Sequence, residues 1–500
     1  MTALRRLGVN STIYTATNML QKGAAFLLLP LYTRFLDPSA YGVLAVVTAV
    51  NGLLSVLFTL GLTGAITRFY FEYQDSPETL AEFWGTVFTF IFLVSTLLVI
   101  VMLTVGQSLL KPLTGGIPFW PYVALGVLTT LFQPFFTTYL ALLQMRNEAR
   151  RFALLSLGNF LMLTALTVAL VVVMGRGVEG SLLAALLSTM ASFGISLWLL
   201  RSQLRISLRW RHLRPALSYS LPLVPHSVAG QTTAFADRIV LNGYSGAAAA
   251  GLYSVGGMVA MVVEVTAQSV NRAYVPLTMA ALKRGSPQDL GEIESMATAI
   301  VGGFLMFGAA IGAFGGEILR LLASPEFASA AAIIPWLVFA GAANAIYLVF
   351  VNVLFYDRSG VRLVPVGTIT GAICSVVFAL CLVPRFGLMG GAVSALLAQA
   401  VATVVIATLG RRLDPVNWHY WRIAAAFVLA LSFSILLSRA HLAYPLTTIA
   451  VKLAGLAALS GLIGMMFWRS PLAMASMLVR LVRFGATQTA GLLNRRRAQE

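Results

Sequence analysis

Hydrophobic residues follow one another along the chain in blocks of about 18 or more, separated by short segments that carry the charges and turn residues. A block of that length spans a bilayer as an α-helix, whereas spanning β-strands would alternate in segments of about ten residues. Cutting the chain at charges and turn residues predicts about fourteen spans. They lie at residues 10–36, 42–67, 83–110, 118–145, 152–175, 179–200, 216–240, 250–281, 295–316, 330–356, 363–384, 387–410, 422–439 and 444–468. We therefore expect an all-α polytopic membrane protein.

The positive charges fall mainly on alternate connections between these spans. If the N-terminus is cytoplasmic, the inside connections hold most of the 34 lysines and arginines. The outside connections hold only Arg34, Lys111, Arg176, Arg238, Arg320, Arg385 and Arg439. This bias predicts an even number of spans with both termini in the cytoplasm.

Composition agrees with a membrane protein, because 59% of the residues are hydrophobic and 10% are charged, against about 25% charged in soluble domains. The net charge of +17 is explained by topology, so nucleic acid is not an expected partner. No metal-binding spacing occurs, and no cofactor is expected.

Two short segments recur at nearly the same distance along the chain. Residues 177–187 match residues 387–397 at an offset of 210, and residues 40–46 match residues 249–255 at an offset of 209. Six spans in each half is an even number, so the halves have the same orientation and a pseudo-twofold axis along the membrane normal. The expected divisions are an N-lobe at 1–205, a C-lobe at 206–412, two extra helices at 413–468 and a basic tail at 469–500. The tail is either a solvated segment or an amphipathic helix on anionic lipid.

Polar residues at helical spacing concentrate on the first, second, seventh and eighth spans, which are equivalent positions in the two halves. The first span carries Asn10, Tyr14, Asn18 and Lys22 in four-residue steps, with Gln21 alongside. The second carries Asn51, Ser55, Thr59, Thr63 and Thr67, ending at Arg68. The seventh carries His226, Asp237 and Arg238, and the eighth Glu264, Gln268, Asn271 and Arg272. A cation at membrane depth costs about 2.5–3.5 kcal/mol, so Lys22 indicates a water-filled path or an anion site.

The predicted central cavity is cation-leaning, which suits a phosphate or diphosphate. Most of the charged residues also have a structural alternative, and Arg272 could pair with Glu264. Arg68 could anchor the inner boundary, Asp237 could pair with Arg238, and His226 could be a hydrogen-bonded structural histidine. Arg34 fits a boundary or gate position better than a ligand.

An ordered set of short motifs runs along most of the chain. It begins with Leu20-Gln-Lys22 and Leu-Pro30-Leu-Tyr32-Thr-Arg34-Phe-Leu-Asp37-Pro-Ser-Ala-Tyr41-Gly42. It continues through Ile66-Thr-Arg68-Phe-Tyr70, Pro222-Leu-Val-Pro225-His226, Asp237-Arg238-Ile-Val-Leu, Gly251-Leu-Tyr253-Ser-Val and Pro384-Arg-Phe-Gly387-Leu-Met-Gly390. With this set the sequence resembles the polysaccharide transporter family, the Wzx-type oligosaccharide flippases of the multidrug/oligosaccharidyl-lipid/polysaccharide (MOP) superfamily.

The resemblance implies a flippase for undecaprenyl-diphosphate-linked oligosaccharide in a bacterial inner membrane, working by alternating access in cell-surface polysaccharide biosynthesis. Substrate contacts would come from Lys22, Arg68, Arg272, Asn18, Gln21, Gln268 and Asn271. Coupling or gating residues would be Glu264, Asp237, Arg238, Arg34 and His226, with H⁺ or Na⁺ as the coupling ion. The expected partners are the lipid-linked glycan, membrane lipids and the polysaccharide polymerase or export machinery.

Three alternatives remain open. A flippase for lipid-linked peptidoglycan precursor would differ only in its substrate. A cation-coupled drug exporter of the same superfamily would have a more acidic cavity. An enzyme such as a polymerase or ligase would need a large outer loop with reactive groups, which this sequence lacks.

Overall fold

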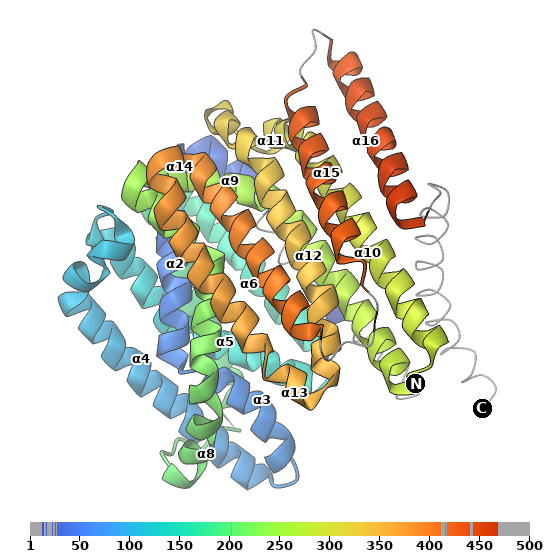
Figure 1. Ribbon diagram of the computed structural model, residues 1–500. Helices are drawn as coiled ribbons and strands as arrows, with labels where there is room; N and C mark the ends of the chain where they lie inside the picture. The colour runs from blue at the N-terminus through green and yellow to red at the C-terminus, as the bar shows by residue number, and fades with distance from the viewer. Residues whose placement is uncertain are drawn as a thin grey trace. The chain divides into compact units, whose positions relative to one another are not determined.

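The structure is a computed structural model that describes residues 28–201, 203–411, 418–440 and 444–468, and the single positions 13, 14, 17, 23, 26 and 416. The described parts contain helices and no strand, which confirms the predicted all-α class (Figure 1). The helices are α2 (Pro38–Thr59), α3 (Leu62–Tyr73), α4 (Pro77–Thr114), η1 (Phe119–Val123), α5 (Ala124–Met145), α6 (Ala149–Thr167), η2 (Val168–Val173), α7 (Gly177–Leu200), α8 (Trp210–Ser220), η3 (Leu221–Leu223), α9 (Val224–Arg284), α10 (Pro287–Ala313), α11 (Gly315–Leu322), η4 (Pro325–Ile333), α12 (Ile334–Tyr356), α13 (Arg358–Val361), α14 (Val364–Gly410), α15 (Tyr420–Ser438) and α16 (Pro445–Trp468). The expected basic tail at 469–500 lies outside the described residues.

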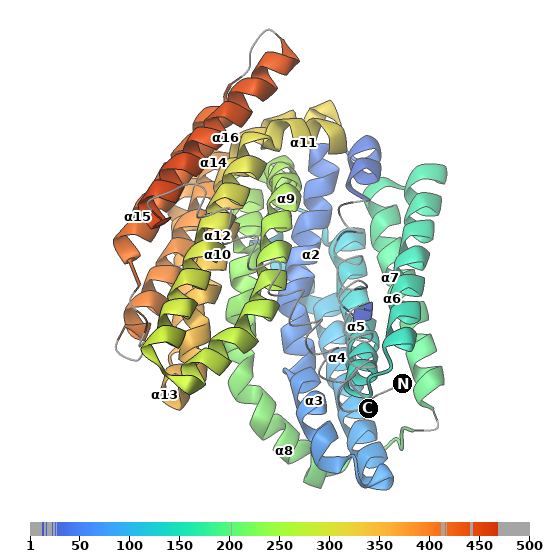
Figure 2. The same ribbon diagram turned by 90° about the vertical axis from the view of Figure 1, so that its right-hand side faces the viewer.

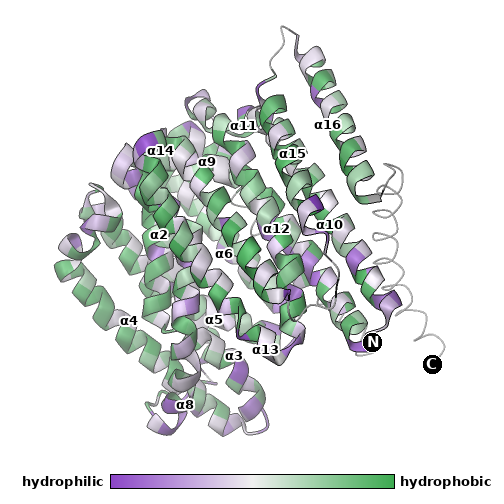
Figure 3. Cartoon of the chain, viewed as in Figure 1, coloured by the Kyte–Doolittle hydropathy of each residue, from purple (hydrophilic) through white to green (hydrophobic). Residues whose placement is uncertain are grey.

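Eleven helical elements in the described part of the chain are long and apolar enough to cross a membrane (Figure 3). Two of these elements each contain a kink between two predicted spans. α9 turns at Gly246, where φ is 81°, and α14 turns at Gly387, where φ is 53°. The first predicted span, 10–36, falls largely outside the described residues. The multi-pass architecture is thus confirmed, and the segment boundaries agree with a count of about fourteen spans.

The second predicted span, 42–67, is not one helix. α2 ends at Thr59, and both Leu60 (φ 48°) and Gly61 (φ 69°) adopt the left-handed conformation before α3 begins. A left-handed residue after the last turn ends a helix, and Gly61 takes that conformation without a steric penalty from Cβ. The polar stripe expected to run from Asn51 to Arg68 is therefore interrupted after Thr59.

The chain separates into two compact units. The first comprises Met1–Ser254, Leu322–Phe327 and Ala379–Gly391, and the second comprises Val255–Leu321, Ala328–Phe378 and Ala392–Glu500. The lobe boundaries expected from the sequence, 1–205 and 206–412, stay a prediction. In the first unit an aromatic-rich core on α3, α4, α5 and α7 buries Phe83, Trp84 and Leu143.

In the second unit, α10 packs against α12 and α15, and α16 packs against both α10 and α15 (Figures 1 and 2). A Cβ added at Gly312 of α10 would overlap the Ser434 hydroxyl of α15, and the Phe339 and Phe427 rings meet edge to face at 5.3 Å. The two extra helices predicted at 413–468 thus pack closely on this unit, because small residues let the helices approach.

The longer sequence repeat has a counterpart in the local geometry. Gly177 and Gly387 both adopt positive φ, 51° and 53°, at the turn that opens the next helix. Three residues on, a Cβ at Gly180 would approach the carbonyl of Leu170, and one at Gly390 would approach the carbonyl of Leu382. The two turns therefore share their glycine spacing and a close approach of the second glycine to the preceding helix.

The shorter repeat supplies two glycines that meet each other. An added Cβ at Gly42 of α2 would overlap the carbonyl oxygen of Ala247, and one at Gly251 of α9 would overlap that of Pro38. Each added Cβ would also lie close to the amide nitrogen of the other glycine, at 3.0 Å for Gly42 and 2.9 Å for Gly251. α2 and α9 therefore cross backbone against backbone, and only glycine fits at the crossing.

Replacing Gly251 with valine should lower the stability of the folded protein by about 1–3 kcal/mol, because overpacking forces the two backbones apart. Gly64→Ala is the matched control, since a Cβ at that helical glycine meets nothing within 4 Å. Thermal unfolding in detergent measures the stability of both variants. Equal unfolding temperatures for the two variants would contradict the close crossing.

Candidate functional site

One face of α9 carries polar side chains at four-residue spacing in its second part. Glu264 and Arg272 are exposed, and Gln268 between them is half-buried. Glu264 lies about midway between the kink at Gly246 and the end of α9 at Arg284, so it falls at membrane depth. Charged side chains at that depth avoid lipid and face water-filled space or one another. This face is therefore a candidate to contact a charged substrate or ion.

Asn271, on the neighbouring turn, has a protein partner. Its side-chain oxygen accepts a hydrogen bond from Asn352 Nδ2 of α12 at 2.6 Å, and Asn352 is buried. Polar pairs of this kind hold membrane helices together. The role of Asn271 as a substrate contact stays a prediction. Its side-chain oxygen already joins α9 to α12 within the second unit.

Asp237 and Arg238 connect the two sides of the kink at Gly246. Buried Asp237 accepts a hydrogen bond from the Tyr253 hydroxyl at 2.8 Å. Arg238 donates through Nε to the Ser254 hydroxyl at 3.1 Å. Asp237 and Arg238 lie before the kink, and Tyr253 and Ser254 lie after it. The two hydrogen bonds therefore hold the bend of α9.

Three other predicted residues lie at helix ends or surfaces. Arg68 is exposed on α3, with its guanidinium 5.3 Å from the centre of the Tyr219 ring of α8. Arg34 is exposed just before α2, where Asp37 caps the helix by accepting from the Ala40 amide at 2.7 Å. His226 is exposed in the first turn of α9.

Lys22, Asn18 and Gln21 lie outside the described residues. Tyr14 of the same stripe is described, and its hydroxyl donates to the Leu143 carbonyl at 3.2 Å. The meeting of Lys22, Arg68 and Arg272 around one diphosphate stays a prediction.

The sequence interpretation missed the partner of a second deep lysine. Lys452 of α16 has no exposed surface, and its Nζ lies 2.7 Å from Glu317 Oε1 of α11 and 2.8 Å from the Ala313 carbonyl oxygen. Glu317 had no place in that interpretation because it falls between two spans, 135 residues before Lys452.

The sequence matches a known family and a curated relative. The family described as "Polysaccharide biosynthesis protein" matches residues 7–281. A curated Lsg locus protein of Haemophilus influenzae is 27% identical over 281 residues, which is 55% of this chain. The chain spans 66% of the length of that relative.

Solved transporter structures share the fold. The Lipid II flippase MurJ in an inward closed conformation has a TM-score of 0.67 at 12% identity, covering 91% of this chain and 98% of the other. An inward-facing multidrug resistance MATE transporter of the MOP superfamily has a TM-score of 0.61 at 18% identity, covering 81% and 95%. At these identities the likeness concerns the fold.

Proposed function

Because the chain belongs to the polysaccharide biosynthesis protein family, we propose that it is a flippase for a lipid-linked oligosaccharide. The substrate would be carried on undecaprenyl diphosphate and moved from the cytoplasmic to the periplasmic leaflet of a bacterial inner membrane. The glycan would then enter cell-surface polysaccharide such as lipopolysaccharide. Shared fold with a flippase and a multidrug transporter supports transport over an enzyme activity.

The observation that carries the proposal is the charged face of α9. Arg272 is suited to hold a diphosphate, since a guanidinium binds phosphate oxygens bidentately. Glu264, two turns away, is suited to bind the coupling ion, H⁺ or Na⁺. A substrate with a charged head and a bilayer-soluble tail needs such a polar path for the head alone.

Alternating access fits the bends in the helices. The glycine kinks of α9 and α14 and the break between α2 and α3 are points where helix segments change angle. The polymerase or export machinery would receive the flipped glycan on the outer side.

A peptidoglycan-precursor flippase is the second candidate, because the Lipid II flippase MurJ shares the fold over 91% of this chain. Both substrates present a diphosphate to the protein, so the charged face suits either. Deleting the gene separates them. An oligosaccharide flippase leaves lipid-linked oligosaccharide on the cytoplasmic side with cell-wall synthesis intact, whereas accumulated peptidoglycan precursor would overturn the oligosaccharide proposal.

Replacing Arg272 with alanine should lower transport roughly 10- to 100-fold, the cost of one charge-assisted contact of about 1.5–3 kcal/mol. Lys283→Ala is the matched control, because Lys283 is exposed on the same helix three turns further on. Transport is measured by export of surface glycan in the deletion strain. Similar export from the two variants would remove Arg272 from the substrate path.

A further inference from the structure

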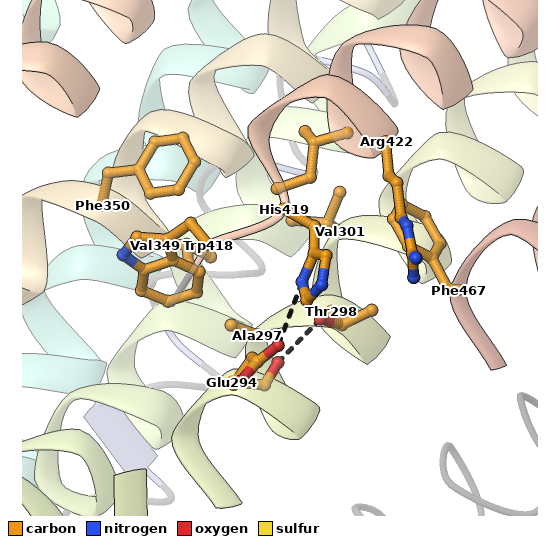
Figure 4. A pocket seen from close by; sticks show the side chains of 11 residues that line it. Glu294, Ala297, Thr298, Val301, Val349, Phe350, Trp418, His419, Arg422 and Phe467 are labelled. Atoms are coloured by element: carbon orange, nitrogen blue, oxygen red, sulfur yellow. Dashed lines mark hydrogen bonds and ion pairs between the residues drawn. The ribbon is translucent and has the colours of Figure 1, made fainter. Parts of the chain in front are cut away.

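A pocket in the second unit lies where α15 begins and α16 ends. Its walls come from α10, α12, the residues that lead into α15 and the last turn of α16 (Figure 4). The cavity volume is about 60 Å³. One water molecule needs roughly 10–15 Å³, so the pocket has room for a group the size of a phosphate.

The pocket has a cationic and an anionic side. Glu294 Oε1 of α10 lies 3.1 Å from His419 Nδ1. In Figure 4 the His419 side chain reaches toward Glu294, and Arg422 extends beside Phe467 on the other side of the pocket. Among the described residues, no ion pair involves Arg422, so its guanidinium charge is available to a ligand.

The surrounding residues place the pocket at the depth of lipid head groups. α15 and α16 are candidate spans, so their ends lie near the membrane boundary. Trp421 is 68% exposed, and Arg422 lies 5.6 Å from its ring. Arg411 lies 4.8 Å from the ring of Tyr420. An exposed Trp and a half-buried Tyr beside arginines at a helix end are typical of the membrane–water interface.

We propose that this pocket binds the head group of phosphatidylethanolamine, a zwitterionic phospholipid. Arg422 contacts the phosphate, and Glu294 accepts hydrogen bonds from the ammonium group. An anionic phospholipid would use the cationic side alone and leave Glu294 against a negative ligand. A choline head group has no N–H for Glu294, so neither lipid matches both sides of the pocket.

The flippase proposal does not use this pocket, and a bound lipid would give it a role. The pocket touches α10, α12, α15 and α16 together, so an occupant links the two extra helices to the body of the second unit. The site is independent of the substrate, because it lies on other helices than the charged face of α9.

Native mass spectrometry of the purified full-length protein tests the site, with phosphatidylethanolamine, phosphatidylglycerol and phosphatidylcholine supplied in turn. We expect phosphatidylethanolamine to be retained best. Arg422→Gln should reduce its retention about tenfold, the worth of one charge-assisted contact. Arg439→Gln, an exposed arginine at the other end of α15, should retain it like the unchanged protein.

Glu294→Gln should remove the preference for phosphatidylethanolamine over phosphatidylglycerol, and this variant carries the test if Arg422→Gln does not fold. Soluble phosphoethanolamine should stabilise the protein against heat far less than the lipid does. Equal retention by the Arg422 and Arg439 variants, or equal retention of all three lipids, would overturn the proposal. Full stabilisation by soluble phosphoethanolamine would assign the pocket to a free phosphate compound instead of a lipid.

Discussion

Glutamine in place of Glu317 should lower the free energy of unfolding by about 3 kcal/mol, because it leaves the charge of Lys452 buried without a counter-ion. Lys452 is completely buried in α16, and Glu317 Oε1 at 2.7 Å is its carboxylate partner among the described residues. The Ala313 carbonyl and the Phe314 ring, 5.4 Å away, cannot replace that charge. Glu317 keeps 28% of its side-chain surface exposed, which places the cost at the low end for a buried pair.

The same carboxylate offers the control. Arg320 also approaches Glu317, at 3.6 Å, but its side chain is 64% exposed. Arg320→Gln should therefore change stability by less than about 1 kcal/mol. The double variant Glu317→Gln with Lys452→Met should recover much of the loss, since no buried charge remains. Thermal unfolding in detergent measures these three variants and Lys452→Met alone, and a double-variant loss equal to the sum of the two single losses would show that Glu317 and Lys452 do not interact.

The pH dependence of stability gives a second measurement of this pair. Burial raises the pKa of Glu317, but the hydrogen bond from Lys452 and the charges of Lys452 and Arg320 outweigh it, so the pKa lies below its usual range. A depressed carboxyl pKa stabilises the fold at pH values above the unfolded pKa. That stability is lost as the pH falls through the pKa of Glu317 in the folded protein. The free energy of unfolding of Glu317→Gln should therefore depend less on pH in the acid range.

Alanine in place of Lys22 should abolish glycan export while the protein still inserts and folds. A lysine in the middle of an apolar span has an insertion cost of about 2.5–3.5 kcal/mol, and such residues mark substrate or ion pathways or pair with another charged group. The measurement is surface glycan in the deletion strain carrying each variant, with membrane yield and unfolding temperature measured alongside.

Lys22→Arg is the matched variant. It keeps the charge and changes the geometry of its donors, so export should fall less than with alanine if charge alone is required. Near-normal export by Lys22→Ala would remove this residue from the substrate path.

The helix pattern was accessible from the sequence because membrane spans follow length and hydrophobicity, which are local properties. The four-residue spacing of Glu264, Gln268 and Arg272 placed them on one face of α9 for the same reason. The glycines at 246 and 387 that separate paired spans also act locally, through the conformations that glycine permits.

Contacts between distant segments were not accessible in this way. Nothing near Asn271 indicates that its oxygen is occupied by Asn352, 81 residues later. The left-handed Leu60 was missed because a leucine there reads as the continuation of a helix. The pocket of Glu294 and Arg422 joins residues from four helices, each of which looks ordinary alone.

The crossing of α2 and α9 at Gly42 and Gly251 responds differently to compression and to separation. Closer approach is blocked at once, because carbonyl oxygens already occupy the space of a Cβ on each side. Separation is opposed further along the same two helices, where the Phe235 side chain of α9 packs against Gly52 of α2. The glycine crossing itself is a steric stop that sets the limit of approach of the two helices.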